Sequence, residues 1–71
     1  MTLWDLTNGA TLQGNIRLSV WKHDEEVKVV EIDQVDDLAY EKKAKRFEDY
    51  EVTYMFASPV DGYLHIELKS E

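Results

Sequence analysis

The sequence is short, acidic and free of cysteine, and these properties exclude several classes of protein. Its 71 residues include 15 acidic and eight basic side chains, which gives a net charge of -7. A chain of this length buries only about 60 % of its unfolded surface, so we expect a single domain, residues 1–71. Without cysteine no disulfide or thiolate metal site can support the fold, and we expect a cytoplasmic protein. No apolar run approaches the roughly 20 residues of a membrane helix.

The first predicted element is a short helix near the N-terminus. The Thr2 hydroxyl and the Asp5 carboxylate can satisfy the free amides of a first helical turn. Asn8-Gly9 is a typical left-handed signal for the end of a helix. We therefore expect one or two helical turns between these residues.

A β-hairpin is predicted next. Ile16, Leu18 and Val20 recur at every second position, which is typical of a strand with one buried face. After a polar turn at 23–25, residues 26–34 are rich in β-branched side chains, but their alternation slips at Val29-Val30. The slip predicts either a β-bulge or a strand buried on both faces at its middle.

The middle of the chain predicts a helix at residues 37–47. Asp36 can cap its start, and Tyr40, Ala44 and Phe47 fall on one stripe of a helical surface. The basic run Lys42 to Arg46 flanks that stripe. Because acidic residues surround this run in an acidic chain, we interpret it as a solvated helix flank and expect no direct binding of nucleic acid or membrane.

A second hairpin closes the chain. In the segment FEDYEVTYMF, residues 47–56, apolar side chains alternate, and the predicted buried face consists of Tyr50, Val52, Tyr54 and Phe56. Residues 58–62 form a turn, and a last strand buries Leu64, Ile66 and Leu68. The predicted fold is of the α+β class: a short N-terminal helix, then hairpin, helix and hairpin. The hairpins are expected to form a four-stranded antiparallel sheet with a helix packed on one face.

The short helix, the strand IRLSVW, the segment FEDYEV and the closing YLHIEL resemble small uncharacterised acidic proteins of prophages and integrative elements of Gram-positive bacteria. The resemblance covers most of the chain. It implies a mobile-element accessory protein that acts on a host process or a defence system.

Chemistry at a catalytic or metal site is not expected. His23 and His65 lack the partners of a zinc site, and the acids at 33–37 lack the glycine and terminal glutamate of a calcium loop. Neither a phosphate-binding loop nor a nucleophile motif is present. We therefore predict a protein that is not an enzyme and that uses no metal or cofactor.

Two sets of residues are candidates for binding a protein partner. Trp21, Met55 and Tyr63 fall opposite the predicted buried rows and would form an apolar docking patch or a homodimer interface. The alternative is that the N-terminal residues Leu3, Trp4 and Leu6 pack over them. Glu31 with Asp33, and Asp49 with Glu51, would form rows of negative charge that attract a basic surface. The sequence predicts a non-enzymatic accessory protein that binds a macromolecule. The alternative is an acidic, anti-CRISPR-like inhibitor that imitates nucleic acid in a host or defence enzyme.

Overall fold

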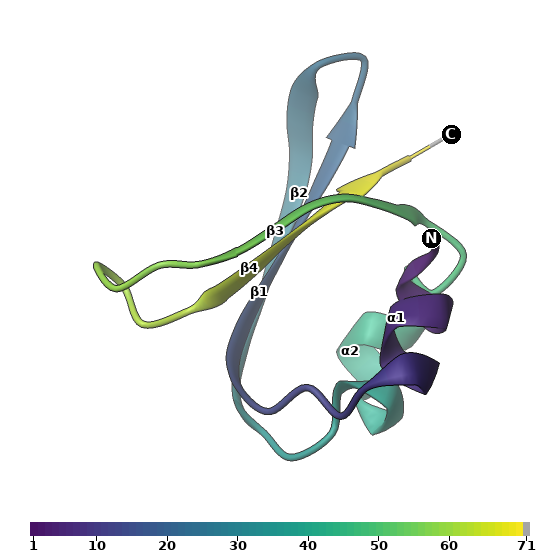
Figure 1. Cartoon of the computed structure of the whole chain (residues 1–71). Helices are drawn as coiled ribbons and strands as arrows, with labels where there is room; N and C mark the ends of the chain where they lie inside the picture. The colour runs from purple at the N-terminus through teal and green to yellow at the C-terminus, as the bar shows by residue number, and fades with distance from the viewer. Residues whose placement is uncertain (71) are drawn as a thin grey trace.

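The computed structural model describes residues 1–70, which form one four-stranded sheet and three short helical segments (Figure 1). The elements in chain order are α1 (Leu3–Gly9), β1 (Gly14–Lys22), β2 (Glu25–Val35), the 3-10 helix η1 (Leu38–Tyr40), α2 (Lys42–Lys45), β3 (Glu51–Ala57) and β4 (Leu64–Lys69). The strand order is β2-β1-β4-β3. The expected α+β class and the four-stranded sheet are confirmed.

The sheet is mixed, so the prediction of an entirely antiparallel sheet was wrong. Both hairpins are antiparallel, but β1 and β4 pair in parallel, with Leu18 opposite Ile66 and Val20 opposite Leu68. This arrangement places the two strands with the most regular apolar rows side by side at the centre. Their buried side chains then form one continuous surface, and β2 and β3 become the edges.

The predicted start of α1 is confirmed. Thr2 Oγ1 accepts a hydrogen bond from the Asp5 N–H at 3.2 Å, and the Asp5 carboxylate accepts one from the Thr2 N–H at 3.0 Å. The second bond lowers the pKa of Asp5. The helix runs through Gly9 and ends at Ala10 in an extended conformation, so the expected left-handed stop is not used.

The first hairpin turns at His23 and Asp24, which both have positive φ, as a two-residue turn of a twisted hairpin requires. The slip at Val29-Val30 predicted either a bulge or a strand buried on both faces, and neither occurs, because these residues pair regularly with Ser19 and Leu18 and Val29 is 38 % exposed. Val30 packs against the core and Val29 lies on the other face of the sheet. The two consecutive apolar residues therefore fit a regular strand. The register instead shifts near each end of β2.

The single helix predicted at residues 37–47 was wrong. Glu41 is extended, with φ -80° and ψ 121°, and separates η1 from the four-residue α2. Asp37, not Asp36, caps η1 by accepting a hydrogen bond from the Ala39 N–H. The break turns Leu38 into the core and leaves Tyr40 80 % exposed, so Tyr40 does not share a buried stripe with Ala44.

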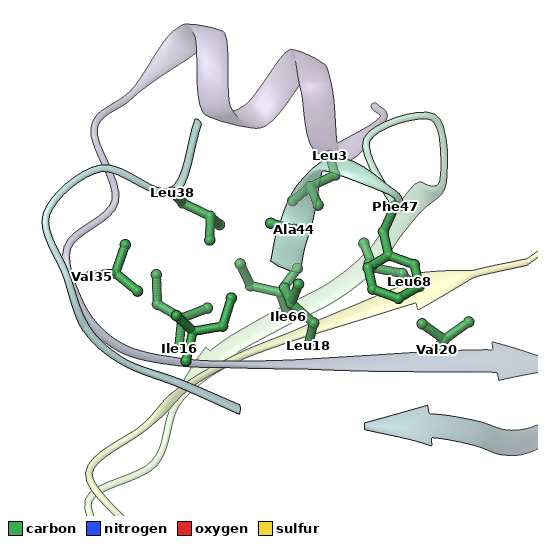
Figure 2. Close-up of a cluster of buried hydrophobic side chains, with 11 residues drawn as sticks. Leu3, Ile16, Leu18, Val20, Val35, Leu38, Ala44, Phe47, Ile66 and Leu68 are labelled. Atoms are coloured by element: carbon green, nitrogen blue, oxygen red, sulfur yellow. The ribbon is translucent and has the colours of Figure 1, made fainter. Parts of the chain in front are cut away.

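The core is one cluster of buried side chains to which both the strands and the helical segments contribute (Figure 2). Its buried members are Leu3, Ile16, Leu18, Val20, Ile32, Val35, Leu38, Ala44, Phe47, Ile66 and Leu68, with Val52 and Leu64 partly buried against them. Tyr54 and Phe56 were predicted in this row but are 59 % and 38 % exposed. A register shift between Val52 and Tyr54 is the cause, because one extra residue in β3 moves every later side chain to the other face.

Candidate protein-binding surface

The outer face is the side of the sheet opposite the core. Alternation along the strands assigns to it Glu26, Val29 and Glu31 of β2, Arg17, Ser19 and Trp21 of β1, His65 and Glu67 of β4, and Tyr54 and Phe56 of β3. The face changes character across the sheet. Charged side chains lie at the β2 side and aromatic ones at the β3 side.

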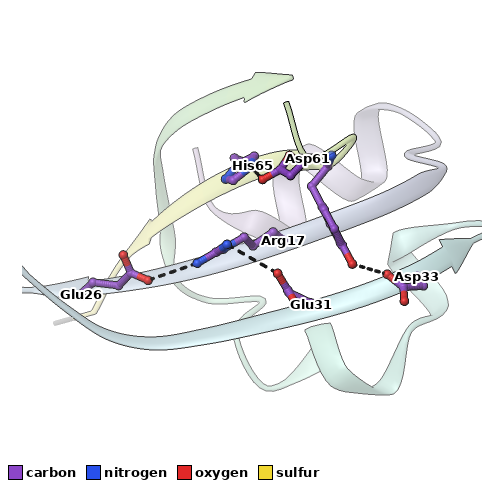
Figure 3. Close-up of polar contacts among 7 residues, drawn as sticks. Arg17, Glu26, Glu31, Asp33, Asp61 and His65 are labelled. Carbon is purple, nitrogen blue, oxygen red and sulfur yellow. Dashed lines mark hydrogen bonds and ion pairs between the residues drawn. The ribbon is translucent and has the colours of Figure 1, made fainter. Parts of the chain in front are cut away.

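Arg17 organises the charged side of the outer face (Figure 3). One guanidinium nitrogen lies 3.5 Å from a Glu31 carboxylate oxygen, and another lies 3.9 Å from Glu26. The pairing of β1 with β2 shifts by one residue between Val20 and Trp21 of β1. This shift brings Glu26 opposite Trp21, on the same face as Arg17. These pairs are half exposed and therefore contribute little stability, but they neutralise part of the acidic edge.

A second polar group ties the β3–β4 turn to the sheet (Figure 3). Asp61 accepts hydrogen bonds from the Tyr63 N–H at 2.9 Å and lies 2.8 Å from His65 Nε2, and the first of these contacts lowers its pKa. The Tyr63 hydroxyl donates to Asp33 at 2.6 Å, which raises the pKa of Tyr63 to about 12. His65 stacks on Phe56 with ring centroids 4.7 Å apart. These contacts fix the hairpin rather than assemble a reactive group.

The outer edge of β3 is protected along only part of its length. The Val52 N–H donates to the Met1 carbonyl at 2.8 Å, and the Leu3 N–H donates to the Tyr50 carbonyl at 2.9 Å. Beyond Val52, the N–H groups of β3 point alternately toward β4 and away from it. The Ser58 N–H donates to the Tyr63 carbonyl, so the N–H groups of Met55 and Ala57, at odd steps from Ser58, face outward. Outside the sheet ladders, neither N–H group donates to a backbone carbonyl within residues 1–70.

Exposed apolar side chains coincide with this open edge. Tyr54 and Phe56 lie on the outer face, and Met55, 44 % exposed, lies on the opposite side of the same strand. Tyr54 and Phe56 are also in contact, with ring centroids 5.4 Å apart. We name residues 53–57 the β3 edge. It combines outward backbone donors with three consecutive large apolar side chains.

The structure separates the three residues of the predicted apolar patch. Trp21 is half-buried at the end of β1, Tyr63 is held by Asp33 at the opposite end of the sheet, and Met55 lies on the other side of β3. Trp21 does line an open hollow of about 630 Å³ together with Thr53, the first residue of the β3 edge. Its Nε1 is buried without a hydrogen-bond partner within the described chain.

The predicted acidic rows are also separated. Glu31 and Asp33 lie on β2, whereas Glu51 begins β3 at the opposite edge of the sheet, roughly 14 Å away for three strand spacings. Asp49 precedes β3 in a turn and does not extend a strand row with Glu51. Arg17 contacts Glu31, and Tyr63 contacts Asp33, so this pair is already engaged.

Sequence reasoning missed Tyr54 and Phe56 as surface residues. Alternation alone assigned them to the core, and only the extra residue at Thr53 reverses them. A partial signal was present: the run Tyr54-Met55-Phe56 is apolar at three consecutive positions, so both faces of the strand carry large apolar side chains and alternation does not identify the buried one.

Residues 1–70 contain no group of three or more metal-ligating side chains and no helix long and apolar enough to cross a membrane. In comparisons with protein-family models, with curated proteins and with solved structures, the chain has no significant match.

Proposed function

We propose that this chain is a non-enzymatic accessory protein, carried by a phage or mobile element, that binds a protein partner on the β3 edge. The observation that carries the proposal is the combination of outward N–H groups at Met55 and Ala57 with the exposed side chains Tyr54, Met55 and Phe56. An edge of this kind is a template for strand addition, in which backbone bonds give affinity and alternate side chains give specificity.

The chemistry of the edge defines the partner. An added strand would need an extended segment with apolar side chains, since the β3 edge carries no charged residue. The hollow beside Trp21 and Thr53 offers a place for one bulky side chain of that segment. The net charge of -7 favours a partner with basic surroundings, because opposite charges accelerate encounter.

Imitation of nucleic acid is the less supported alternative. It requires an ordered row of free carboxylates, whereas Glu31 and Asp33 are engaged by Arg17 and Tyr63 and lie far from Glu51. The resemblance to acidic mobile-element proteins is compatible with both functions.

The proposal is tested by photocrosslinking in host cells. A photoreactive residue at Tyr54 should give a defined protein adduct, whereas the same residue at Tyr40, an exposed tyrosine far from the β3 edge in sequence, should not. The adduct at Tyr54 should disappear in an Ala57→Pro variant, which removes an outward N–H from an edge strand that tolerates proline. Equal labelling at both tyrosines would contradict the proposal.

Charge substitutions separate the two functions. Changing Glu31 to Gln together with Asp33 to Asn should leave the adduct at Tyr54, and a rise in salt should weaken it only modestly. Loss of the adduct in that double variant, with competition by nucleic acid, would favour imitation instead. An adduct formed only with a second copy of the chain would identify the β3 edge as the homodimer interface, and sedimentation equilibrium would then show a dimer.

A further inference from the structure

A basic hollow lies between β2 and α2, on the side of the sheet opposite the outer face. It has a volume of about 360 Å³ and is lined by Lys28, Val30, Lys42, Lys43 and Arg46. Four of the eight basic side chains of the chain therefore line one hollow, although the protein has a net charge of -7.

The fold brings these cations together from two separate parts of the chain. Lys28 and Val30 are two residues apart on β2 and share the face that packs on the core, where Lys28 Nζ lies 6.0 Å from the centre of the Phe47 ring. The register shift in β2 matters here, since it directs Lys28 to this face and Glu26 to the other. Lys42 and Arg46 lie one helical turn apart across α2.

In the part of the chain that the structure describes, the four cations have no carboxylate partner within ion-pair distance. Within residues 1–70 every ion pair involves Arg17 or His65, and none involves a residue of the basic hollow. Like charges one helical turn apart repel, and the repulsion grows when Lys28 approaches from the sheet. An anion in the hollow would relieve this repulsion and accept several charge-assisted hydrogen bonds.

We propose that the basic hollow binds a small, multiply charged phosphate compound, such as a nucleotide polyphosphate. Its size suits such a ligand, and Val30 provides an apolar contact beside the charges. A long nucleic acid is a poorer fit, because Glu41 and Glu48 flank the basic run Lys42 to Arg46 in the sequence, and their carboxylates repel phosphate. This site is separate from the β3 edge and does not depend on the proposed function.

The test is a calorimetric titration of the full chain with tripolyphosphate. We expect saturable binding of one anion per chain, with an affinity that falls as salt rises. Lys42→Gln and Lys28→Gln should each weaken binding by about tenfold, the loss expected for one charge-assisted hydrogen bond. Lys45→Gln is the matched control. It removes the same charge from the same helix, but Lys45 lines a different, smaller hollow beside Leu3, so binding should change little.

Other outcomes would overturn the proposal. If Lys45→Gln weakens binding as much as Lys42→Gln, the affinity depends only on the net charge of the protein, and the hollow is not a binding site. Absence of saturable binding at millimolar tripolyphosphate would have the same meaning. Tighter binding of a single-stranded oligonucleotide, or of vesicles containing phosphatidylglycerol, would replace the small anion with a polymer or a membrane surface. Circular dichroism of each variant excludes unfolding as the cause of a loss.

Discussion

The two edge strands of the sheet differ in how they resist pairing with other chains. β2 carries charged residues along its length, with Glu25, Glu26, Lys28, Glu31 and Asp33, and its register shifts near both ends. Charges and irregular register are the usual means of keeping an edge unpaired. β3 carries no charge beyond Glu51, its register shifts only at its start, between Val52 and Tyr54, and only its first residues are covered by the N-terminal segment. The contrast indicates that one edge is protected against pairing while the other stays available for it.

The largest effect is expected from the core that supports both edges. Ile66 is completely buried on β4, opposite Leu18, so Ile66→Ala leaves a cavity and should lower the free energy of unfolding by about 2 to 5 kcal/mol. Tyr54→Ala on the β3 edge should cost no more than about 0.5 kcal/mol. Urea unfolding of both variants measures the difference, and equal losses would place Tyr54 in the core after all.

The cover over the start of β3 is the next contact to test. Thr2 caps α1 and forms a β-bridge with Glu51, so Thr2→Ala should lower stability by about 1 kcal/mol. Thr2→Ser keeps the capping hydroxyl and serves as the control. Hydrogen exchange at the Val52 N–H should accelerate in the alanine variant, because its bond to the Met1 carbonyl depends on the position of the N-terminus. Unchanged exchange would show that the cover does not depend on the cap.

A charge on each edge compares the two strands directly. Met55→Lys should leave stability nearly unchanged, within about 0.5 kcal/mol, but should abolish any association through the β3 edge. Val29→Lys on β2 is the matched change, since both side chains are partly exposed on edge strands. We expect it to alter neither stability nor association by sedimentation. Loss of association in the β2 variant alone would reverse the comparison.

The smallest effect concerns the bond between the β3–β4 turn and β2. The pKa of Tyr63 is raised to about 12 from an ordinary value of 10.0, mainly because its hydroxyl donates to Asp33. The folded pKa exceeds the unfolded one, so the stabilising contribution is complete below pH 10 and is lost as pH rises through about 12. Tyrosinate absorbance should show this late ionisation disappear in Tyr63→Phe and shift downward in Asp33→Asn. No shift in Asp33→Asn would remove the carboxylate as the cause.

Local patterns predicted the strands and the start of α1, but neither the helix break at Glu41 nor the way in which the strands combine. The apolar alternation of Ile16, Leu18 and Val20 and the capping pair Thr2 and Asp5 depend on near neighbours, and both predictions are confirmed. The parallel pairing of β1 with β4 depends on contacts between distant strands, which periodicity does not contain. The extra residue at Thr53 also depends on a contact with a distant strand, because the Thr53 hydroxyl donates a hydrogen bond to the Glu67 carbonyl on β4.

The candidate site was predicted only in part, and for the same reason. Trp21 and Met55 were identified as surface residues, but their assignment to one patch depended on a register that β3 does not have. The basic hollow was interpreted as a solvated flank, because the sequence shows Lys42 to Arg46 as one run. Lys28 joins them only through the fold.

The parallel pair at the centre of the sheet also sets the order in which the protein can fold. Ile16 in β1 finds its neighbour Leu64 in β4 only after 48 further residues have been made, since 64 minus 16 is 48. Closing so long a loop is slow. The first hairpin alone is at best marginally stable, because it lacks the third strand, β4, that pairs with β1. On the ribosome the chain should therefore remain without a stable core until β4 has emerged, and the nascent β1–β2 hairpin should rely on its acidic side chains to avoid aggregation.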